Sequence, residues 1–256
     1  MRTGFMKHIN DLVKQSDLVL EVLDARHPEK TRNPVLETLV KKNRRKLLLV
    51  INKADLVTKE EMEKKKQDIS GSSHIKTIFI SALERDGINM IRREISVLSE
   101  GRTNFTVGII GYPNVGKSTL INVLAGKGRG RVATSRKAGL TRGISKVKIS
   151  EGLYLIDSPG IIPFNEDEFD LFLVESKNPN QLKDVEMSAV KLIQAYGKER
   201  IAKAYGIELE KLEGKDEEEI LDEIAIKNSF LLKGGKPDML KAARELLEKY
   251  QRHEIA

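Results

Sequence analysis

The sequence of 256 residues predicts an α/β fold, in which helices cover both faces of a mostly parallel sheet, followed by a small all-helical domain. Two observations lead to this prediction. Short apolar runs alternate with helical segments through about the first 170 residues, and polar motifs follow several of these runs, where ligands bind in open α/β sheets. Strand-like runs then cease, so we predict one domain over residues 1–170 and a helical domain over residues 171–256.

The predicted strands are short runs that are mostly apolar, and the predicted helices are the amphipathic or charged segments between them. Leu18–Leu23 is nearly continuous in apolar residues, which is typical of a strand buried on both faces. The other predicted strands are 46–51, 76–80, 105–110, 146–149 and 153–156, the last two forming a hairpin around Glu151-Gly152. The predicted helices are 5–15, 33–43, 58–69, 87–99, 117–125, 185–197, 216–227 and 237–251.

Composition narrows the class of protein. A net charge of +7 and a pI near 9.3 favour a polyanionic partner. The absence of cysteine excludes disulfides and thiolate metal sites, and the four histidines show no metal-ligand spacing. No apolar run approaches the ~20 residues that span a bilayer, and residues 1–5 contain no signal-peptide core. We therefore expect a cytoplasmic protein with no membrane partner, and a monomer.

A phosphate-binding motif follows the strand at 105–110. Gly111–Thr119 fits the P-loop pattern G-x-x-x-x-G-K-[ST], whose glycines let backbone N–H groups converge on phosphates. Lys117 is expected to reach the β- and γ-phosphates and to act in catalysis, and Ser118 to ligate Mg²⁺. The residues of this loop expected to bind nucleotide are Asn114, Val115, Gly116, Lys117, Ser118 and Thr119.

A motif that selects guanine lies about sixty residues before the P-loop. Asn52-Lys53-Ala54-Asp55 reads N-K-x-D, which resembles the guanine-reading element of GTPases. With Asn52, Asp55 selects the base, because its carboxylate can accept hydrogen bonds from guanine N1–H and the 2-amino group, which adenine lacks. Lys53 would lie along the plane of the base. Ser81-Ala82 resembles the third guanine element, whose backbone N–H contacts O6.

Two further motifs follow the P-loop. Asp157-Ser158-Pro159-Gly160 fits D-x-x-G, in which Asp157 would hold a Mg²⁺-bound water and the Gly160 N–H would meet the γ-phosphate during catalysis. A threonine between the P-loop helix and this motif is needed as the remaining Mg²⁺ ligand. We choose Thr141, in Gly139-Leu140-Thr141, over its competitor Thr134, and assign it a catalytic role as well.

The motif order resembles that of the circularly permuted ribosome-assembly GTPases, of the YlqF/RbgA type. The resemblance is sharpened by Asp24-Ala25-Arg26 followed by Arg32-Asn33-Pro34, a D-A-R…R-N-P signature, and by Lys233–Asp238, which resembles the G-G-x-x-D element of that family's C-terminal domain. It covers nearly the whole chain. It implies a permuted P-loop GTPase fold, GTP hydrolysis at a slow intrinsic rate, and maturation of the large ribosomal subunit.

The residue that orients the attacking water stays open. The position of the Ras glutamine is Ile161, and the family's upstream histidine falls at Met1, so we interpret His8 as an ordinary helix residue. Asn114 resembles the asparagine that ligates K⁺ in potassium-activated relatives, which makes K⁺ a candidate second cation beside Mg²⁺. Arg26 either ties the D-A-R strand structurally or faces the ribosome.

Clusters of basic residues favour contact with ribosomal RNA. Contact through phosphates fits better than stacking on bases, because aromatic residues are only 5% of the chain and tryptophan is absent. The clusters are Lys127, Arg129, Arg131, Arg136, Lys137, Arg142, Lys146 and Lys148; Lys41, Lys42, Arg44, Arg45 and Lys46; and Lys233, Lys236, Lys241 and Arg244. The acidic stretch 216–223 should avoid RNA. Two alternatives to the large-subunit assembly GTPase are a nucleotide-gated RNA-binding scaffold with negligible hydrolysis and a small-subunit assembly GTPase.

Overall fold

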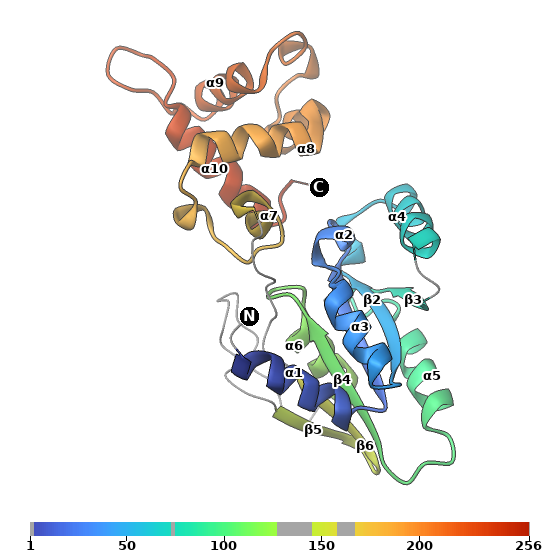
Figure 1. The fold of residues 1–256 in the computed structure, drawn as a ribbon. Coiled ribbons are helices and arrows are strands. Elements are labelled where there is room, and N and C mark those ends of the chain that lie inside the picture. Colours follow the sequence, from blue (N-terminus) through green and yellow to red (C-terminus); the bar gives the residue numbers. More distant parts are fainter. Residues whose placement is uncertain (1–2, 73–74, 127–144, 158–166, 256) are drawn as a thin grey trace. The chain divides into compact units, whose positions relative to one another are not determined.

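The computed structural model describes residues 3–72, 75–126, 145–157 and 167–255. The chain forms two compact units, residues 1–166 and 167–256. The expected boundary between residues 170 and 171 lies inside helix α7 (Glu168–Leu173). Figure 1 shows the sheet with its helices, and separately the helical unit.

Six strands form one sheet in the described residues of the first unit. They are β1 (Leu18–Asp24), β2 (Lys46–Asn52), β3 (Thr77–Phe79), β4 (Phe105–Gly111), β5 (Ser145–Ser150) and β6 (Leu153–Asp157). Their order is β3-β2-β1-β4-β6-β5, and every neighbouring pair is parallel except the β5–β6 hairpin. Each residue of β1 and β4 is buried, which agrees with their nearly continuous apolar sequences. The predicted fold class is confirmed.

Helices pack on both faces of this sheet. They are α1 (Thr3–Gln15), α2 (Pro28–Thr31), α3 (Pro34–Lys42), α4 (Lys59–Ser72), α5 (Ile88–Ser99) and α6 (Lys117–Ala125), with a short 3₁₀ turn η1 (Ala54–Leu56). Buried side chains of α1 and α3 share one core cluster with Val19 of β1 and Ile110 of β4. In Figure 1, α1 and α3 cross the near side of the sheet and α6 lies on the far side.

A glutamate occupies the buried centre of β1. The side chain of Glu21 is fully buried, and its Oε1 accepts a hydrogen bond of 2.8 Å from the backbone N–H of Asn33, the N-cap residue of α3. Its Oε2 has no hydrogen-bond partner in the part of the chain that the structure describes. Burial raises the pKa of Glu21 to about 8, since the low-polarity interior disfavours the charged form.

The buried glutamate makes stability depend on pH. Between pH 4.5 and about 8 the carboxyl of the unfolded chain is ionised while that of the folded chain holds its proton, so stability falls as pH rises. Glu21→Gln, which cannot ionise, is therefore expected to exceed the wild type in stability at pH 7.5 by a few kcal/mol, on the order of 1.4 kcal/mol per unit of pKa shift. Urea denaturation at pH 5 and pH 7.5 measures this. An equal difference at both pH values would contradict it.

The second unit is entirely helical in its described residues. It contains α7, α8 (Val185–Tyr205), α9 (Glu217–Lys227) and α10 (Met239–Gln251), with 3₁₀ turns η2 (Pro179–Gln181) and η3 (Leu209–Lys211). Gly197, at φ 79° and ψ 159°, breaks α8 into two helical parts. The core centres on Tyr250, whose ring lies 5.4 Å from both the Phe172 and Tyr196 rings and whose hydroxyl donates to the Leu173 carbonyl at 2.6 Å. None of the described helices is long and apolar enough to cross a membrane.

Candidate nucleotide-binding site

The predicted motifs meet at the carboxyl ends of the central strands. Asp24 pairs with Asn52 in the β1–β2 register, and Val22 pairs with Gly111 in the β1–β4 register. From this central pair of strands the chain continues outward in both directions, so the P-loop lies at the point where strand order reverses. Ligands of open α/β sheets bind at this point.

Asn52 joins the guanine motifs to the P-loop. Its Nδ2 donates to the Val115 carbonyl at 2.8 Å, and its Oδ1 accepts from the Ala82 N–H at 2.9 Å. Only 3% of the residue is exposed. The sequence predicted Asn52 as a reader of the base, whereas in the structure its side chain links three motifs that are far apart in sequence. The proximity of these motifs could not be read from any one of them.

Replacement of Asn52 by alanine should damage the whole site. It would leave a buried carbonyl and a buried N–H without partners, at about 1–3 kcal/mol each. We expect GDP affinity to fall about 10- to 100-fold in fluorescent-nucleotide titrations, with a lower Tm. Asn52→Asp is the companion variant: it can still accept from Ala82, but it places a carboxylate oxygen against the Val115 carbonyl in a buried site, so it should lose at least as much affinity as Asn52→Ala. Wild-type affinity in both variants would contradict the bridging role.

Two glycines of the P-loop are required by geometry. Gly116 has φ 94°, and a Cβ atom there would lie 2.2 Å from Asn52 Nδ2. Gly111 has φ 149°, and a Cβ atom there would lie 2.4 Å from the Val22 carbonyl oxygen. A side chain at either position would push the loop away from the strands that support it. The close approach lets the Val115 carbonyl reach Asn52.

Lys117 begins α6 and is buried in the P-loop. Its Nζ donates to the Gly111 carbonyl at 3.0 Å and to the Tyr112 carbonyl, and 8% of the residue is exposed. Burial lowers the pKa of Lys117 to about 8, and the charge of Asp157 at the end of β6 opposes this shift. An anion bound in the loop would stabilise the charged form, so this ammonium is suited to phosphate.

Asp55 and Lys53 hold different positions in the guanine motif. Asp55 is exposed in η1, and its carboxylate makes no hydrogen bond with the described residues, so it can accept from a ligand. Lys53 has a left-handed backbone at φ 65°, and its Nζ lies 2.9 Å from Asp24 Oδ2. The carboxylate of Asp24 therefore orients the ammonium of Lys53.

Arg26 completes this group and has a structural partner. Its Nε and Nη2 donate to the two carboxylate oxygens of Asp24 at 3.0 and 2.7 Å, and both residues are buried. Burial by itself would raise the pKa of Asp24, but Lys53 and Arg26 outweigh it and hold the pKa far below its usual range. Of the two roles considered for Arg26, this geometry favours the structural one, in which Arg26 is held by Asp24. The Asp24–Lys53 contact was missed because it needs the β1–β2 register.

Asp24 should affect nucleotide binding through Lys53. Asp24→Asn is expected to weaken GDP binding about tenfold, because the lysine loses the charge that orients it. When Lys53 is already alanine, Asp24→Asn should weaken GDP binding little further. Titration of the wild type, the two single variants and the double variant measures this non-additivity. Asp17→Asn is the control, since Asp17 lies before β1 and pairs with Arg102 at 2.9 Å. Additive losses would mean that Asp24 acts only on stability.

The donors at the expected magnesium site are oxygen atoms. The Ser118 hydroxyl lies in the first turn of α6, and the Asp157 carboxylate lies at the end of β6, next to β4 in the sheet. Hydroxyl and carboxylate suit Mg²⁺, which typically takes few protein ligands and several waters or phosphate oxygens. The described residues contain no group of three or more His, Asp or Glu side chains that could hold a metal.

Other predicted positions lie partly outside the described residues. Thr141, its competitor Thr134, Gly160 and Ile161 all fall there, so their roles stay predictions. Ser81 is buried, and its Oγ accepts from the Glu84 N–H at 3.1 Å. The N–H of Ala82, expected at guanine O6, donates to Asn52 instead. Asn114 has a left-handed backbone at φ 59°, and Thr119 lies in the first turn of α6; their roles in binding nucleotide also stay predictions.

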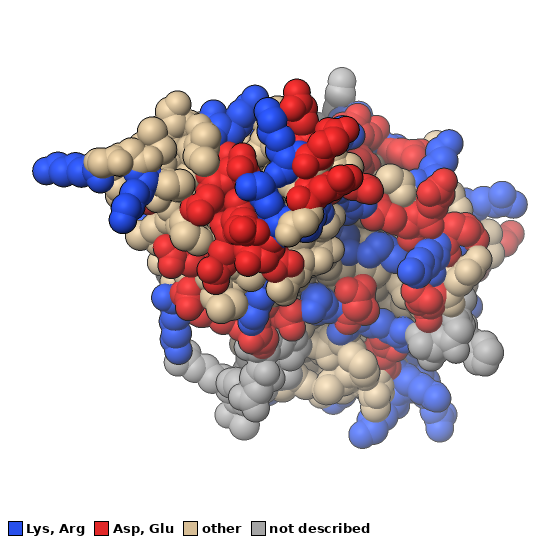
Figure 2. Space-filling view, turned by 90° about the horizontal axis from the view of Figure 1, so that it is seen from above, with Lys and Arg blue, Asp and Glu red and all other residues tan. Residues whose placement is uncertain are grey.

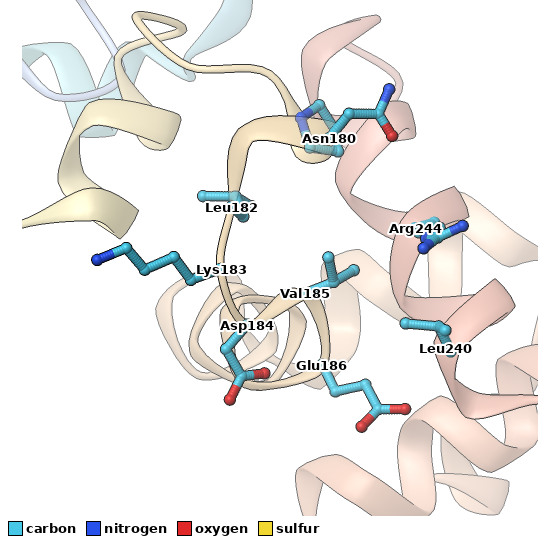
Figure 3. A pocket seen from close by; sticks show the side chains of 9 residues that line it. Asn180, Leu182, Lys183, Asp184, Val185, Glu186, Leu240 and Arg244 are labelled. Carbon is cyan, nitrogen blue, oxygen red and sulfur yellow. The ribbon is translucent and has the colours of Figure 1, made fainter.

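A surface pocket of about 400 Å³ lies in the helical unit and contains none of these residues. It is formed by the segment 179–186, which includes the start of α8, and by Leu240 and Arg244 of α10 (Figure 3). Acidic, basic and apolar side chains line it together, including Asp184, Glu186 and Lys183. This mixture does not specify a ligand class.

The fold and the motif order define a P-loop GTPase that is circularly permuted, because the guanine motif precedes the P-loop in sequence yet joins it in space. The family described as "50S ribosome-binding GTPase" matches residues 106–222. The GDP-bound structure of YlqF is similar with a TM-score of 0.66 and 25% identity, over 96% of this chain and 94% of that one. The GNP-bound YlqF from T. maritima gives a TM-score of 0.64 at 25% identity, over 98% of this chain and 94% of that one. The chain is thus a circularly permuted P-loop GTPase that is similar to YlqF over nearly its whole length.

Curated relatives agree with this assignment. An uncharacterized GTP-binding protein of Methanocaldococcus jannaschii is 37% identical over 250 residues, which cover 96% of this chain and 64% of that protein. Nuclear/nucleolar GTPase 2 of Oryza sativa is 31% identical over 251 residues, or 95% of this chain and 46% of that protein. The chain thus spans about half to two thirds of the length of these relatives.

Proposed function

We propose that this protein binds GTP with Mg²⁺, hydrolyses it slowly, and couples hydrolysis to assembly of the large ribosomal subunit through contacts with ribosomal RNA. The observation that carries the nucleotide part is the double hydrogen bond of Asn52, which joins the P-loop to both guanine motifs. Asp55 stands beside it with an exposed carboxylate. The family description and the names of the nucleolar relatives support the ribosomal part.

The residues of the site have separate roles in this proposal. Lys117 binds the phosphates, Asp55 reads guanine, and Ser118 with Asp157, the latter through a water, holds Mg²⁺. When bound, the metal neutralises charge that develops on the transferred phosphoryl group. Thr141 is proposed as the remaining metal ligand and catalytic residue, and Gly160 as the donor to the γ-phosphate. Asn114 is the proposed K⁺ ligand.

The charge of the helical unit fits an RNA partner on one part of its surface. Figure 2 shows Asp and Glu side chains over a broad area, and basic side chains on a segment that projects at the left edge. Figure 1 places the projecting segment between α9 and α10, where Lys233 and Lys236 are exposed beside the positive-φ glycines Gly234 and Gly235. The acidic α9 face should avoid phosphates, whereas the projecting loop can approach them.

The proposal is tested by GTP turnover in K⁺ and in Na⁺, with and without purified ribosomal subunits. We expect stimulation by the large subunit and little by the small one. Stimulation by the small subunit alone would move the proposal to small-subunit assembly. Equal rates in K⁺ and Na⁺ would remove Asn114 as a K⁺ ligand. A cytoplasmic location and a monomeric state stay predictions.

A second candidate is a nucleotide-gated RNA-binding scaffold with negligible hydrolysis. The sequence favours it because Ile161 occupies the position of the water-orienting glutamine, and the family's histidine falls at Met1. Within the described part of the chain, His8 is exposed on α1. GTP binding without turnover under any of the conditions above would favour the scaffold.

A further inference from the structure

Six basic residues gather where α1 and α3 end and β2 begins. We call this set the basic end surface: Lys14, Lys41, Lys42, Arg44, Arg45 and Lys46. All are exposed except Arg45, which is partly exposed and donates from Nη2 to the Lys14 carbonyl at 2.6 Å, joining the two helix ends. Two acidic residues lie close to Lys14 in sequence. Asp17 is paired with Arg102, which leaves Asp11, one helical turn before Lys14, to offset the positive charge of the basic end surface.

The cations of this surface have few partners. Lys41, Lys42, Arg44 and Lys46 form no ion pair or side-chain hydrogen bond with the residues that the structure describes. Elsewhere in the chain, several cations are neutralised within 3 Å, as in Arg26–Asp24, Lys76–Glu94 and Lys177–Glu168. Like charges held close together repel, and a polyanion relieves that repulsion.

One member of the surface lies in a conformation that favours glycine. Arg44 has φ 53° and follows the C-cap of α3, where its N–H donates to the Lys41 carbonyl and the Arg45 N–H donates to the Val40 carbonyl. This is the Schellman arrangement, which usually places glycine at that position. A side chain there costs free energy that glycine avoids. Lys41 and Lys42 in the last turn of α3 already interact favourably with the helix dipole. The dipole therefore does not explain why position 44 is an arginine.

We propose that the basic end surface binds the phosphodiester backbone of structured RNA, and that it does so independently of the bound nucleotide. This inference deepens the proposed function and rests on it. The surface lies at the start of β2, while Asn52 lies at its end, so the seven-residue strand separates them by about 20 Å. RNA and nucleotide can therefore bind at the same time, RNA at the amino end and nucleotide at the carboxyl end of the strands.

The test uses the full chain and a structured transcript of large-subunit ribosomal RNA, titrated at several salt concentrations. Arg44→Gly is expected to raise Tm, because the backbone strain is relieved, and yet to weaken RNA binding about 3- to 10-fold. The slope of log affinity against log salt should fall by about one. Lys42→Ala/Lys46→Ala should weaken binding further. The losses should be equal with GDP and with a GTP analogue.

Lys64→Ala/Lys66→Ala is the matched control, because it removes the same charge from α4, where glutamates are interspersed. It should leave RNA binding close to the wild type. Unchanged affinity and salt slope in Arg44→Gly and in the double variant would overturn the assignment of this surface, while wild-type binding to RNA would leave the proposed function standing. Loss of binding to whole subunits but not to the bare transcript would point to a ribosomal protein and also overturn it. A wild type that binds neither would contradict the proposed function itself.

Discussion

Replacement of Lys117 by alanine is expected to reduce GTP turnover about 10²- to 10³-fold, the usual cost of removing one preorganised charge from a transition state. The ammonium of Lys117 already lies in the loop, held by the Gly111 and Tyr112 carbonyls. In the bound state, phosphate oxygens would accept hydrogen bonds from this ammonium and pair with its positive charge. Turnover under single-turnover conditions with saturating GTP measures the loss separately from binding.

The alanine variant should still fold. Burial lowers the pKa of Lys117 to about 8, so the protein carries a cost for keeping this group charged at neutral pH. Removing the group should therefore leave Tm unchanged or higher while turnover falls. Lys64→Ala, an exposed change on α4, is the control for loss of one positive charge. A variant with low turnover and low Tm would indicate a structural role, and wild-type turnover would exclude Lys117 from catalysis.

The sheet could be predicted because its strands are buried on both faces. β1, β2 and β4 are apolar runs, and such runs identify strands without knowledge of their neighbours. The second part of α8 could not be predicted in the same way. The sequence predicts a helix that ends at Gly197, and Gly197 does have a non-helical φ and ψ, but the chain resumes a helix immediately afterwards. Packing of Ile201 and Tyr205 into the core of the unit supports this second part.

The motifs of the site could be predicted singly, but their mutual contacts could not. N-K-x-D indicates guanine here because it follows a buried strand in a chain that also carries a P-loop, and because Asp55 supplies the required acceptor. The roles of Asn52, Asp24 and Arg26 depend on strand register, which a single sequence does not give. For Arg26 the sequence left two roles open, a structural contact within the D-A-R segment and exposure to the ribosome, and only the structure shows its bidentate contact with Asp24.

Replacement of Asp55 by asparagine is expected to lower GDP and GTP affinity about 10²-fold or more and to shift base preference from guanine to xanthine. The carboxylate can accept from both guanine N1–H and the 2-amino group, whereas an amide presents one donor to one of them. An unmatched polar contact costs about 1–3 kcal/mol, and a donor facing a donor costs more. Xanthine carries a carbonyl oxygen in place of the 2-amino group. The asparagine amide can donate to that oxygen and accept from N1–H.

Measuring XDP binding distinguishes a loss of base recognition from a loss of structure. Titration with fluorescent GDP and XDP should show the variant binding XDP more tightly than the wild type does, which a destabilised site could not achieve. Asp68→Asn, an exposed carboxylate on α4, should change neither affinity. Because Asp55 makes no hydrogen bond with the described residues, its substitution removes no internal contact there. If the variant lost GDP without gaining XDP, Asp55 would not be the base-reading residue, and the guanine specificity proposed for this chain would need another source.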